Sequence, residues 1–357
     1  MRFFKGIPVI DPNIEFNDVV ADKISKSSYV YLMDHMPETR YYDFVSGFKD
    51  SYRYFFEKYN IDYANKIFIC DHYLNLESLD RVIPNVDLFD KGNFFVWECK
   101  NFLKEFKNHK IDFQPIGKML SFMSNKSRPN RCLTSKVIAN YFDINSINYS
   151  YVNNLGQQGL ANELLKNIDQ KLIDKFLPEQ WFYNKNETHN RIVNESRIDH
   201  STNTEQYKIL KDCLFVDSAI SIISEPCFFE KGTIFTEKTL MAIYSGHFMI
   251  WPGMYKSAET FSKFGFDIFD DIIDHSYQYN KDPGLRVLEA FTKNIKLLNN
   301  LELQNKFRYE FQSRLLENFN HSRDITGLNE KILDIQIGNA KLDNRLELEK
   351  IKRSINV

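Results

Sequence analysis

Residues 224–253 read SEPCFFEKGTIFTEKTLMAIYSGHFMIWPG. An apolar, β-prone run at 219–223 leads into this stretch, and an acidic loop follows it. From Thr236 the apolar residues take helical spacing as far as Gly246, after which a second apolar run ends in a Pro-Gly turn. The pattern predicts strand, acidic loop, helix, strand and turn, which is the order that builds an α/β sheet.

The predicted helix begins with Thr236, Glu237 and Lys238. A helix N-terminus at the carboxyl edge of a parallel sheet is suited to bind phosphate groups, and Lys238 would add positive charge there. The same residues also fit a purely structural role, with Thr236 as the N-cap, Glu237 at the positive end of the helix and Lys238 in solvent. Spacing and composition leave both interpretations open.

A second loop with possible anion-binding chemistry lies between a predicted strand at 119–123 and a predicted helix at 132–141. It contains Arg128 and Arg131. A guanidinium group can pair with phosphate through two hydrogen bonds. A solvated basic loop has the same composition, so the residues alone leave the role of these arginines open.

Residues 224–253 resemble the α-1,3-fucosyltransferase family, in a form typical of phages and bacteria. That family has Tyr-Val-Thr-Glu-Lys after an acid-bearing loop, then a helix and an apolar strand ending in Gly; this chain has Ile-Phe-Thr-Glu-Lys at 234–238. The family begins its second domain with Ser-Asn and an Arg six residues after the Asn, and Ser124, Asn125 and Arg131 keep that spacing. The resemblance implies the GT-B fold, an α/β architecture in which two Rossmann-like domains face a cleft, here with a C-terminal helical segment added.

The resemblance also implies which residues bind a nucleotide-sugar donor. Glu237 would bind the ribose, and Lys238 and Arg131 would bind the diphosphate. From its position after the strand, and not from the resemblance, we expect Glu225 to hold the sugar. The complete expected set of donor-binding residues comprises Ser124, Asn125, Arg128, Glu225, Phe235, Thr236 and Glu237, with Lys238 and Arg131 as catalytic residues. Arg128 has no fixed counterpart in the motif of the family.

Transfer to a hydroxyl group also needs a base that removes the proton of the acceptor. The family uses a Glu in a Gly-Glu-Asn-Glu-Ser-Pro loop after a strand of its first domain. The nearest segment here, residues 32–37, has the strand and the proline but lacks the Glu, so Asp34 or His35 would have to serve. The alternatives at the ends of other predicted strands are Asp71, His72 and Glu98.

The domain prediction follows from alternating strand and helix patterns. We expect an acceptor-side α/β domain at 1–115, a nucleotide-sugar-binding α/β domain at 116–320 and a helical tail at 321–357, with the first boundary next to a basic link at 107–110. Further expectations are strands at 28–33, 66–70 and 93–99, a loop at 82–89, and single helices at 162–176, 283–298 and 301–319.

Composition limits the class of protein. A chain of 357 residues with 43% hydrophobic content can bury a large core, and its length suggests two domains. The net charge of −2 gives no general basic surface for nucleic acid. No apolar run approaches the roughly 18 residues of a membrane span and no signal peptide is evident, so we expect no membrane span and a cytoplasmic location.

Metal chemistry is not expected from the sequence. The five cysteines show no metal-binding spacing, and the chain contains no Asp-x-Asp, the usual metal–diphosphate signature of the other large glycosyltransferase fold. We therefore expect neither a metal nor another cofactor, apart from the nucleotide sugar as donor substrate.

The function expected from these features is transfer of a sugar from a nucleotide-diphosphate sugar to a hydroxyl group of a glycan or another acceptor. The reaction would be inverting and metal-independent, with Arg131 and Lys238 stabilising the departing diphosphate. One alternative is a phage-type glycosyltransferase that acts on modified bases in DNA, for which a local basic loop such as 126–128 would suffice. The other alternative is a carbohydrate-binding or structural protein that keeps the fold without catalysis.

Overall fold

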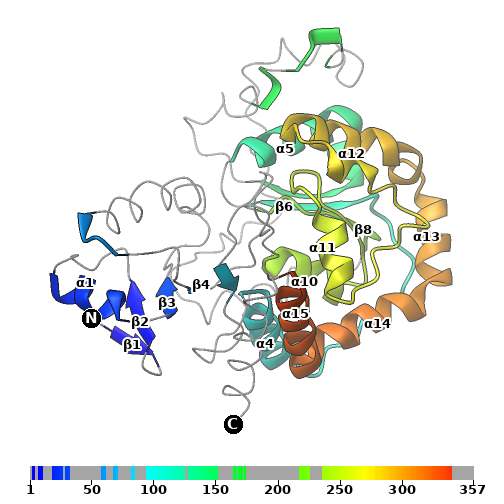
Figure 1. Ribbon diagram of the computed structural model, residues 1–357. Coiled ribbons are helices and arrows are strands. Elements are labelled where there is room, and N and C mark those ends of the chain that lie inside the picture. The colour runs from blue at the N-terminus through cyan, green and yellow to red at the C-terminus, as the bar shows by residue number, and fades with distance from the viewer. Residues whose placement is uncertain are drawn as a thin grey trace. The chain divides into compact units, whose positions relative to one another are not determined.

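The computed structural model describes residues 2–4, 7–10, 18–26, 29–32, 58–61, 67–70, 82–84, 94–124, 128–151, 164–166, 168–171, 173, 217–225 and 235–339. The chain forms two compact units. The first comprises Met1–Trp97, Lys231–Ile234 and Thr326–Val357, and the second comprises Glu98–Glu230 and Phe235–Ile325. Each unit contains a β-sheet (Figure 1), so the chain is an α/β protein, as the sequence predicts.

The sheet of the first unit has the strand order β1-β2-β3-β4-β5. Its strands are β1 (Arg2–Phe4), β2 (Ile7–Ile10), β3 (Tyr29–Leu32), β4 (Ile67–Cys70) and β5 (Val82–Pro84), and helix α1 (Asp18–Ser25) lies between β2 and β3 in the chain. β1 and β2 pair antiparallel, and the other neighbours pair parallel. The strands predicted at 28–33 and 66–70 are confirmed. The loop predicted at 82–89 is wrong at β5, whose β-branched Val82 and Ile83 pair with β4.

Helix α4 (Phe94–Glu105) corrects the strand predicted at 93–99. The short apolar run Phe-Phe-Val-Trp fits either a strand or a helix. Further along, Phe95, Cys99, Phe102 and Phe106 are all buried, and this spacing is the repeat of one helical face. Glu98 therefore lies within a helix rather than at a strand end, and its side chain is buried.

The sheet of the second unit determines where a ligand site can form. Its four strands are parallel and have the order β7-β6-β8-β9. They are β6 (Ser121–Ser124), β7 (Asn148–Tyr151), β8 (Ile220–Ile222) and β9 (Phe248–Ile250). The chain goes from β6 to β7 on one side, and β8 then pairs with the other side of β6. The direction of winding thus reverses between β6 and β8, the place where open α/β sheets bind ligands.

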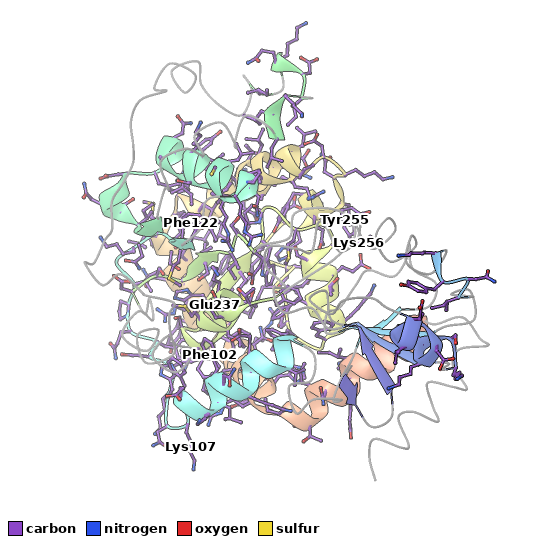
Figure 2. The ribbon with its side chains drawn as sticks, turned by 90° about the vertical axis from the view of Figure 1, so that its left-hand side faces the viewer. Phe102, Lys107, Phe122, Glu237, Tyr255 and Lys256 are labelled. Atoms are coloured by element: carbon purple, nitrogen blue, oxygen red, sulfur yellow. The ribbon has the colours of Figure 1, made fainter. Side chains whose placement is uncertain are left out.

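Helices cover both faces of this sheet. Helix α5 (Pro129–Tyr141) packs against α12 (Pro283–Leu298) on one face, and α10 (Glu237–Tyr244) packs against α14 (Gln312–Arg323) on the other (Figure 1). Buried apolar side chains of the strands, α5 and α12 pack together between the sheet and these two helices (Figure 2). The helix predicted at 283–298 is confirmed, and Asp282 caps it by accepting hydrogen bonds from two of its first backbone N–H groups.

The helix predicted at 301–319 is instead two helices, α13 (Leu301–Glu310) and α14, which meet at Phe311. Arg314 holds this break. Its guanidinium pairs with Asp267 and Asp271 and lies 4.7 Å from the ring centroid of Phe269 and 4.8 Å from that of Phe311. The break therefore coincides with tertiary contacts of Arg314, and neither Pro nor Gly lies at it.

The remaining elements are short or lie near the C-terminus. They are the 3-10 turns η4 (Ile144–Ser146) and η5 (Ser276–Tyr279), helix α11 (Ser257–Lys263) and helix α15 (Ile325–Asn339). In the segment predicted as one helix at 162–176, the described residues are helical at 164–165, 170–171 and 173 but not at 166, 168 and 169. Among the described helices, none combines the length and the apolar character needed to cross a membrane.

Helix α13 fixes the segment at 107–118 within the second unit. Arg308 donates hydrogen bonds to the carbonyl groups of Asp112 (2.8 Å) and Gln114 (3.3 Å). Asn305 exchanges two hydrogen bonds with the backbone of Ile116. The predicted division at 115/116 lies within the second compact unit, because the two units change over at Trp97–Glu98. The functional assignment of the domains stays a prediction.

Gly246, where α10 ends, allows this segment to approach closely. Its φ is +65°, and a Cβ atom there would lie 2.5 Å from Cγ2 of Ile111. We expect Gly246→Ala to lower the free energy of unfolding by about 1–3 kcal/mol, because the new methyl group overpacks the contact and strains the left-handed backbone. Chemical denaturation measures the change. Gly117→Ala is the matched control, since a Cβ there meets no atom within 4 Å, and an equal effect of both substitutions would contradict the steric explanation.

Candidate functional site

The loops after β6 and β8 lie at the carboxyl edge of the sheet in the second unit. Arg128 immediately precedes α5, Ser224 and Glu225 follow β8, and Thr236 immediately precedes α10. Although α5 and α10 cover opposite faces of the sheet, their first turns both contact the loop after β8. This is the reversal point of the sheet, so the candidate site lies where the topology favours a ligand.

The first turn of α5 fixes the loop after β8. The side-chain amide of Asn130 donates to Oγ of Ser224 (3.0 Å) and to the carbonyl oxygen of Glu225 (2.9 Å). Nε of Arg131 donates to the carbonyl oxygen of Ser224 (2.9 Å). All these residues are buried. Arg131 therefore has a structural role here, and its expected contact with the diphosphate stays a prediction.

Glu225 anchors the first turn of α10. Its Oε1 accepts hydrogen bonds from the backbone N–H group of Thr236 and from the hydroxyl group of Thr239, each at 2.8 Å. Its Oε2 accepts a hydrogen bond from Oγ1 of Thr236 at 2.6 Å. Burial raises the pKa of Glu225 above its ordinary value, and the charge of Lys238 opposes that rise. Both carboxylate oxygens are engaged within the protein, so the structure gives Glu225 an anchoring role; its expected contact with the sugar stays a prediction.

Thr236 is the N-cap of α10, as the sequence predicts. Its backbone is extended, and its Oγ1 accepts a hydrogen bond from the backbone N–H of Lys238 at 3.4 Å. Because its hydroxyl also donates to Glu225, Thr236 connects the helix to the loop after β8.

Glu237 and Lys238 form an ion pair next to this cap. Nζ of Lys238 lies 2.5 Å from Oε1 of Glu237, and only 10% and 11% of the two side chains are exposed. Burial alone would raise the pKa of Glu237, but the charge and the hydrogen bond of Lys238, together with the charge of Arg131, outweigh it and lower the pKa to about 2. Glu237 is therefore an ionised hydrogen-bond acceptor at neutral pH.

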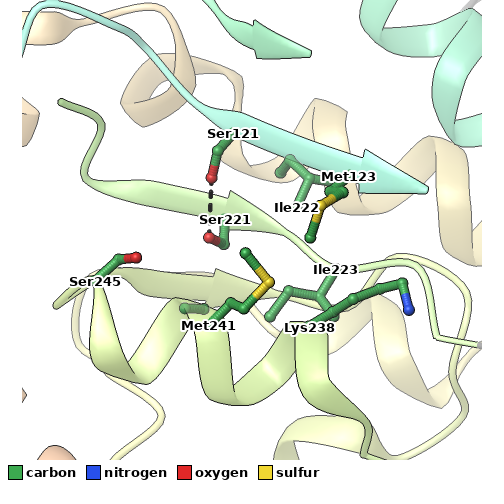
Figure 3. Close-up of a pocket in the computed structure, with 9 residues that line it drawn as sticks. Ser121, Met123, Ser221, Ile222, Ile223, Lys238, Met241 and Ser245 are labelled. Carbon is green, nitrogen blue, oxygen red and sulfur yellow. Dashed lines mark hydrogen bonds between the residues drawn. The ribbon is translucent and has the colours of Figure 1, made fainter. Parts of the chain in front are cut away.

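A narrow crevice runs between α10 and the sheet (Figure 3). Its walls comprise Ser121 and Met123 of β6, Ser221, Ile222 and Ile223 at β8, and Lys238, Met241, Ala242 and Ser245 on the side of α10. Lys238 lies at the end toward which the strands run. In the interior, Oγ of Ser221 lies 3.0 Å from Oγ of Ser121 and 2.8 Å from Nδ1 of His247. The crevice thus has Lys238 at one end and a lining of mixed serine and apolar side chains.

A third loop, after β9, is fixed to the same edge by two residues that the sequence did not single out. Asn130 packs against Gly253, where a Cβ atom would lie 2.9 Å from its Nδ2. Arg286 of α12 is buried and donates to the carbonyl oxygens of Gly253 (3.2 Å) and Asn280 (2.6 Å). Tyr255 and Lys256 follow in this loop (Figure 2), and the guanidinium of Arg286 lies over the ring of Tyr255. No local sequence pattern predicts these contacts, because each one joins residues that are distant in the chain.

The remaining residues that the sequence predicted for the site differ in burial and in location. Ser124 is buried at the end of β6, and Arg128 is half-buried at the extended position before α5. Phe235 is buried, and its ring contacts those of Trp251, Phe261 and Phe264, so its side chain belongs to the core. The predicted residues that lie outside the described part of the chain are Asn125, Asp34, His35, Asp71 and His72.

In the described part of the chain, no group of three or more His, Cys, Asp or Glu side chains is arranged to hold a metal ion. Comparison of the sequence and structure with models of protein families, with curated proteins and with solved structures gave no match. The geometry of the reversal point and the motif resemblance are therefore the grounds for a functional proposal.

The anchoring role of Glu225 predicts a large stability effect. We expect Glu225→Ala to lower the free energy of unfolding by more than about 2 kcal/mol, because it leaves the donors of Thr236 and Thr239 buried without their acceptor. Thermal and chemical unfolding measure the loss. Glu259→Ala, which removes a carboxylate that pairs with Lys263 on the surface of α11, is the control and should change stability by less than about 1 kcal/mol.

Glu225→Gln adds a test of the pH dependence. A carboxyl group with a raised pKa contributes stability below its ordinary pKa of 4.5 and loses it as the pH rises through the raised value. Relative to the non-titrating Gln variant, the wild type should therefore become less stable over that pH interval. A stability difference that is independent of pH would show that folding does not raise the pKa of Glu225.

Proposed function

We propose that the second unit binds a nucleoside diphosphate at the reversal point between β6 and β8. The observation that carries this proposal is the placement of Lys238 and the N-terminus of α10 at the carboxyl end of β8, beside the loop that Arg131 contacts. Helix N-termini favour anions through their backbone N–H groups and the helix dipole. Glu237 supplies an ionised carboxylate beside them that can accept hydrogen bonds from hydroxyl groups.

We further propose that the bound nucleotide carries a sugar and that the protein transfers it to a hydroxyl group. Departure of a nucleoside diphosphate leaves negative charge on its phosphates, which Lys238, Arg131 and the helix N-terminus can stabilise. The resemblance of Ile-Phe-Thr-Glu-Lys at 234–238 to the α-1,3-fucosyltransferase motif supports sugar transfer rather than another use of the nucleotide. The absence of Asp-x-Asp from the sequence supports a metal-independent reaction, which we propose to be inverting.

The proposed architecture is GT-B, in which the second unit binds the donor and the first unit carries the acceptor side. Two α/β units in one chain support this architecture at a coarse level. The acceptor would be a glycan or another hydroxyl compound, and Asp34 or His35 would be the base.

Ligand-dependent thermal stabilisation tests nucleotide binding. We expect one of GDP, UDP and ADP, or a corresponding sugar nucleotide, to raise the unfolding temperature, since a ligand at a hundred times its dissociation constant adds about 2.7 kcal/mol. The same ligand should stabilise Lys238→Ala much less. Lys263→Ala, which removes a lysine of a surface ion pair on α11, is the matched control and should respond like the wild type. Absence of a shift with every nucleotide would contradict the proposal.

Transfer itself is tested by turnover of a labelled nucleotide sugar. Lys238→Ala should reduce the rate about a hundred- to a thousand-fold, the usual loss when one preorganised donor to developing charge is removed. Lys238→Arg should restore part of it, because a planar guanidinium cannot occupy the same point as an ammonium group. Activity should survive excess EDTA. Near-normal turnover by Lys238→Ala, or loss in EDTA that manganese restores, would show that the site is wrongly assigned.

A further inference from the structure

The ion pair between Glu237 and Lys238 has a consequence for ligand selection. In this structure the ammonium group expected at the diphosphate donates to Oε1 of Glu237 at 2.5 Å. Both side chains are about nine-tenths withdrawn from solvent. The carboxylate of Glu237 thus occupies the partner position that a phosphate oxygen of a ligand would take at Lys238.

A ligand that is only an anion has to separate this pair. Its phosphate would form an ion pair with Lys238. Glu237 would then be a largely buried carboxylate that has lost its cation and lies next to a second negative charge. Lys238 is the main cause of the lowered pKa of Glu237, so separating the pair removes that stabilisation whether Glu237 stays ionised or takes up a proton. Breaking a buried pair by removing one partner is strongly unfavourable.

A ligand that also carries hydroxyl groups meets a different situation. Its hydroxyl groups can donate hydrogen bonds to Glu237 while its phosphate forms an ion pair with Lys238. Each member of the pair thus exchanges one partner for another. Hydrogen bonds to an ionised acceptor are among the stronger ones, and they compensate the carboxylate for the lost ammonium.

We propose that Glu237 acts as an internal anion. It pairs with Lys238 when no ligand is bound, and it restricts the site to ligands that combine phosphate with hydroxyl donors. Phosphorylated sugars and nucleotides satisfy both groups, whereas inorganic phosphate and pyrophosphate satisfy only Lys238. The inference rests on the proposed nucleotide site. It assigns Glu237 a role in specificity, namely the exclusion of bare phosphate compounds.

The test compares pyrophosphate with GDP and UDP by isothermal titration calorimetry on the full chain in metal-free buffer. Wild-type protein should bind the better nucleotide clearly and pyrophosphate weakly. Glu237→Gln removes the internal anion with little change of shape, and it should bind pyrophosphate about tenfold more tightly or better. The advantage of the nucleotide over pyrophosphate should shrink in the same variant. Adding Lys238→Met to Glu237→Gln should abolish the gain, because Lys238 is the group that Glu237 releases.

Two further variants keep the result interpretable. Glu259→Gln breaks a surface ion pair with Lys263 on α11 and should leave both affinities unchanged. Glu237→Asp keeps the charge but draws the carboxylate back by one methylene group, and it should also bind pyrophosphate more tightly than wild type. It serves as the test if Glu237→Gln does not fold, as judged by circular dichroism.

The outcomes separate this inference from the proposed function. Unchanged pyrophosphate affinity in the folded Glu237 variants overturns the inference, even where GDP or UDP binds the wild type. Conversely, a gain in pyrophosphate affinity in a protein whose wild type binds no nucleoside diphosphate supports the internal anion and overturns the proposed nucleotide site. Weak pyrophosphate binding by wild type with a gain in Glu237→Gln, together with nucleotide binding, supports both.

Discussion

The hydrogen bonds that the carboxylate of Glu225 receives from α10 hold the candidate site together. Upstream, Asn130 and Arg131 of α5 fix the backbone on either side of this residue. Downstream, Thr239 donates to Glu225 and accepts a hydrogen bond from the indole N–H of Trp251 at 3.2 Å. One continuous polar network therefore joins α5, the loop after β8, the first turn of α10 and the end of β9.

This network lies in the interior, where polar groups are stabilising only when they are paired. Glu225 finds its donors in a helix cap, and Glu237 finds a cation in the adjacent residue Lys238. The two neighbouring acids consequently differ in character, since burial raises the pKa of Glu225 while Lys238 and Arg131 lower that of Glu237. The helix cap is thus fixed by Glu225, whereas the ammonium group of Lys238 is directed at Glu237.

Local patterns were enough to predict much of the second unit. The capping threonine at 236, the glycine at 246 and the periodic apolar residues of α12 each reflect interactions within a few positions, so the sequence shows them directly. Other features depend on distant partners. Asn130 contacts a loop 94 and 95 positions away, and the break at Phe311 depends on Arg314 reaching Asp267, 47 positions earlier. The start of α4 was missed for a different reason, because a short apolar run has no periodicity of its own.

The hydrogen bonds between α13 and the segment at 107–118 bear on how the protein can be dissected. A fragment that began at residue 116 would lack the carbonyl groups of Asp112 and Gln114, and the buried guanidinium of Arg308 would lose these acceptors. It would also lack Phe102 and Phe106, whose rings pack against Tyr244 of α10. The shortest piece that preserves the sheet of the second unit together with its supporting contacts therefore includes α4, so that the natural place to cut the chain lies ahead of Phe94.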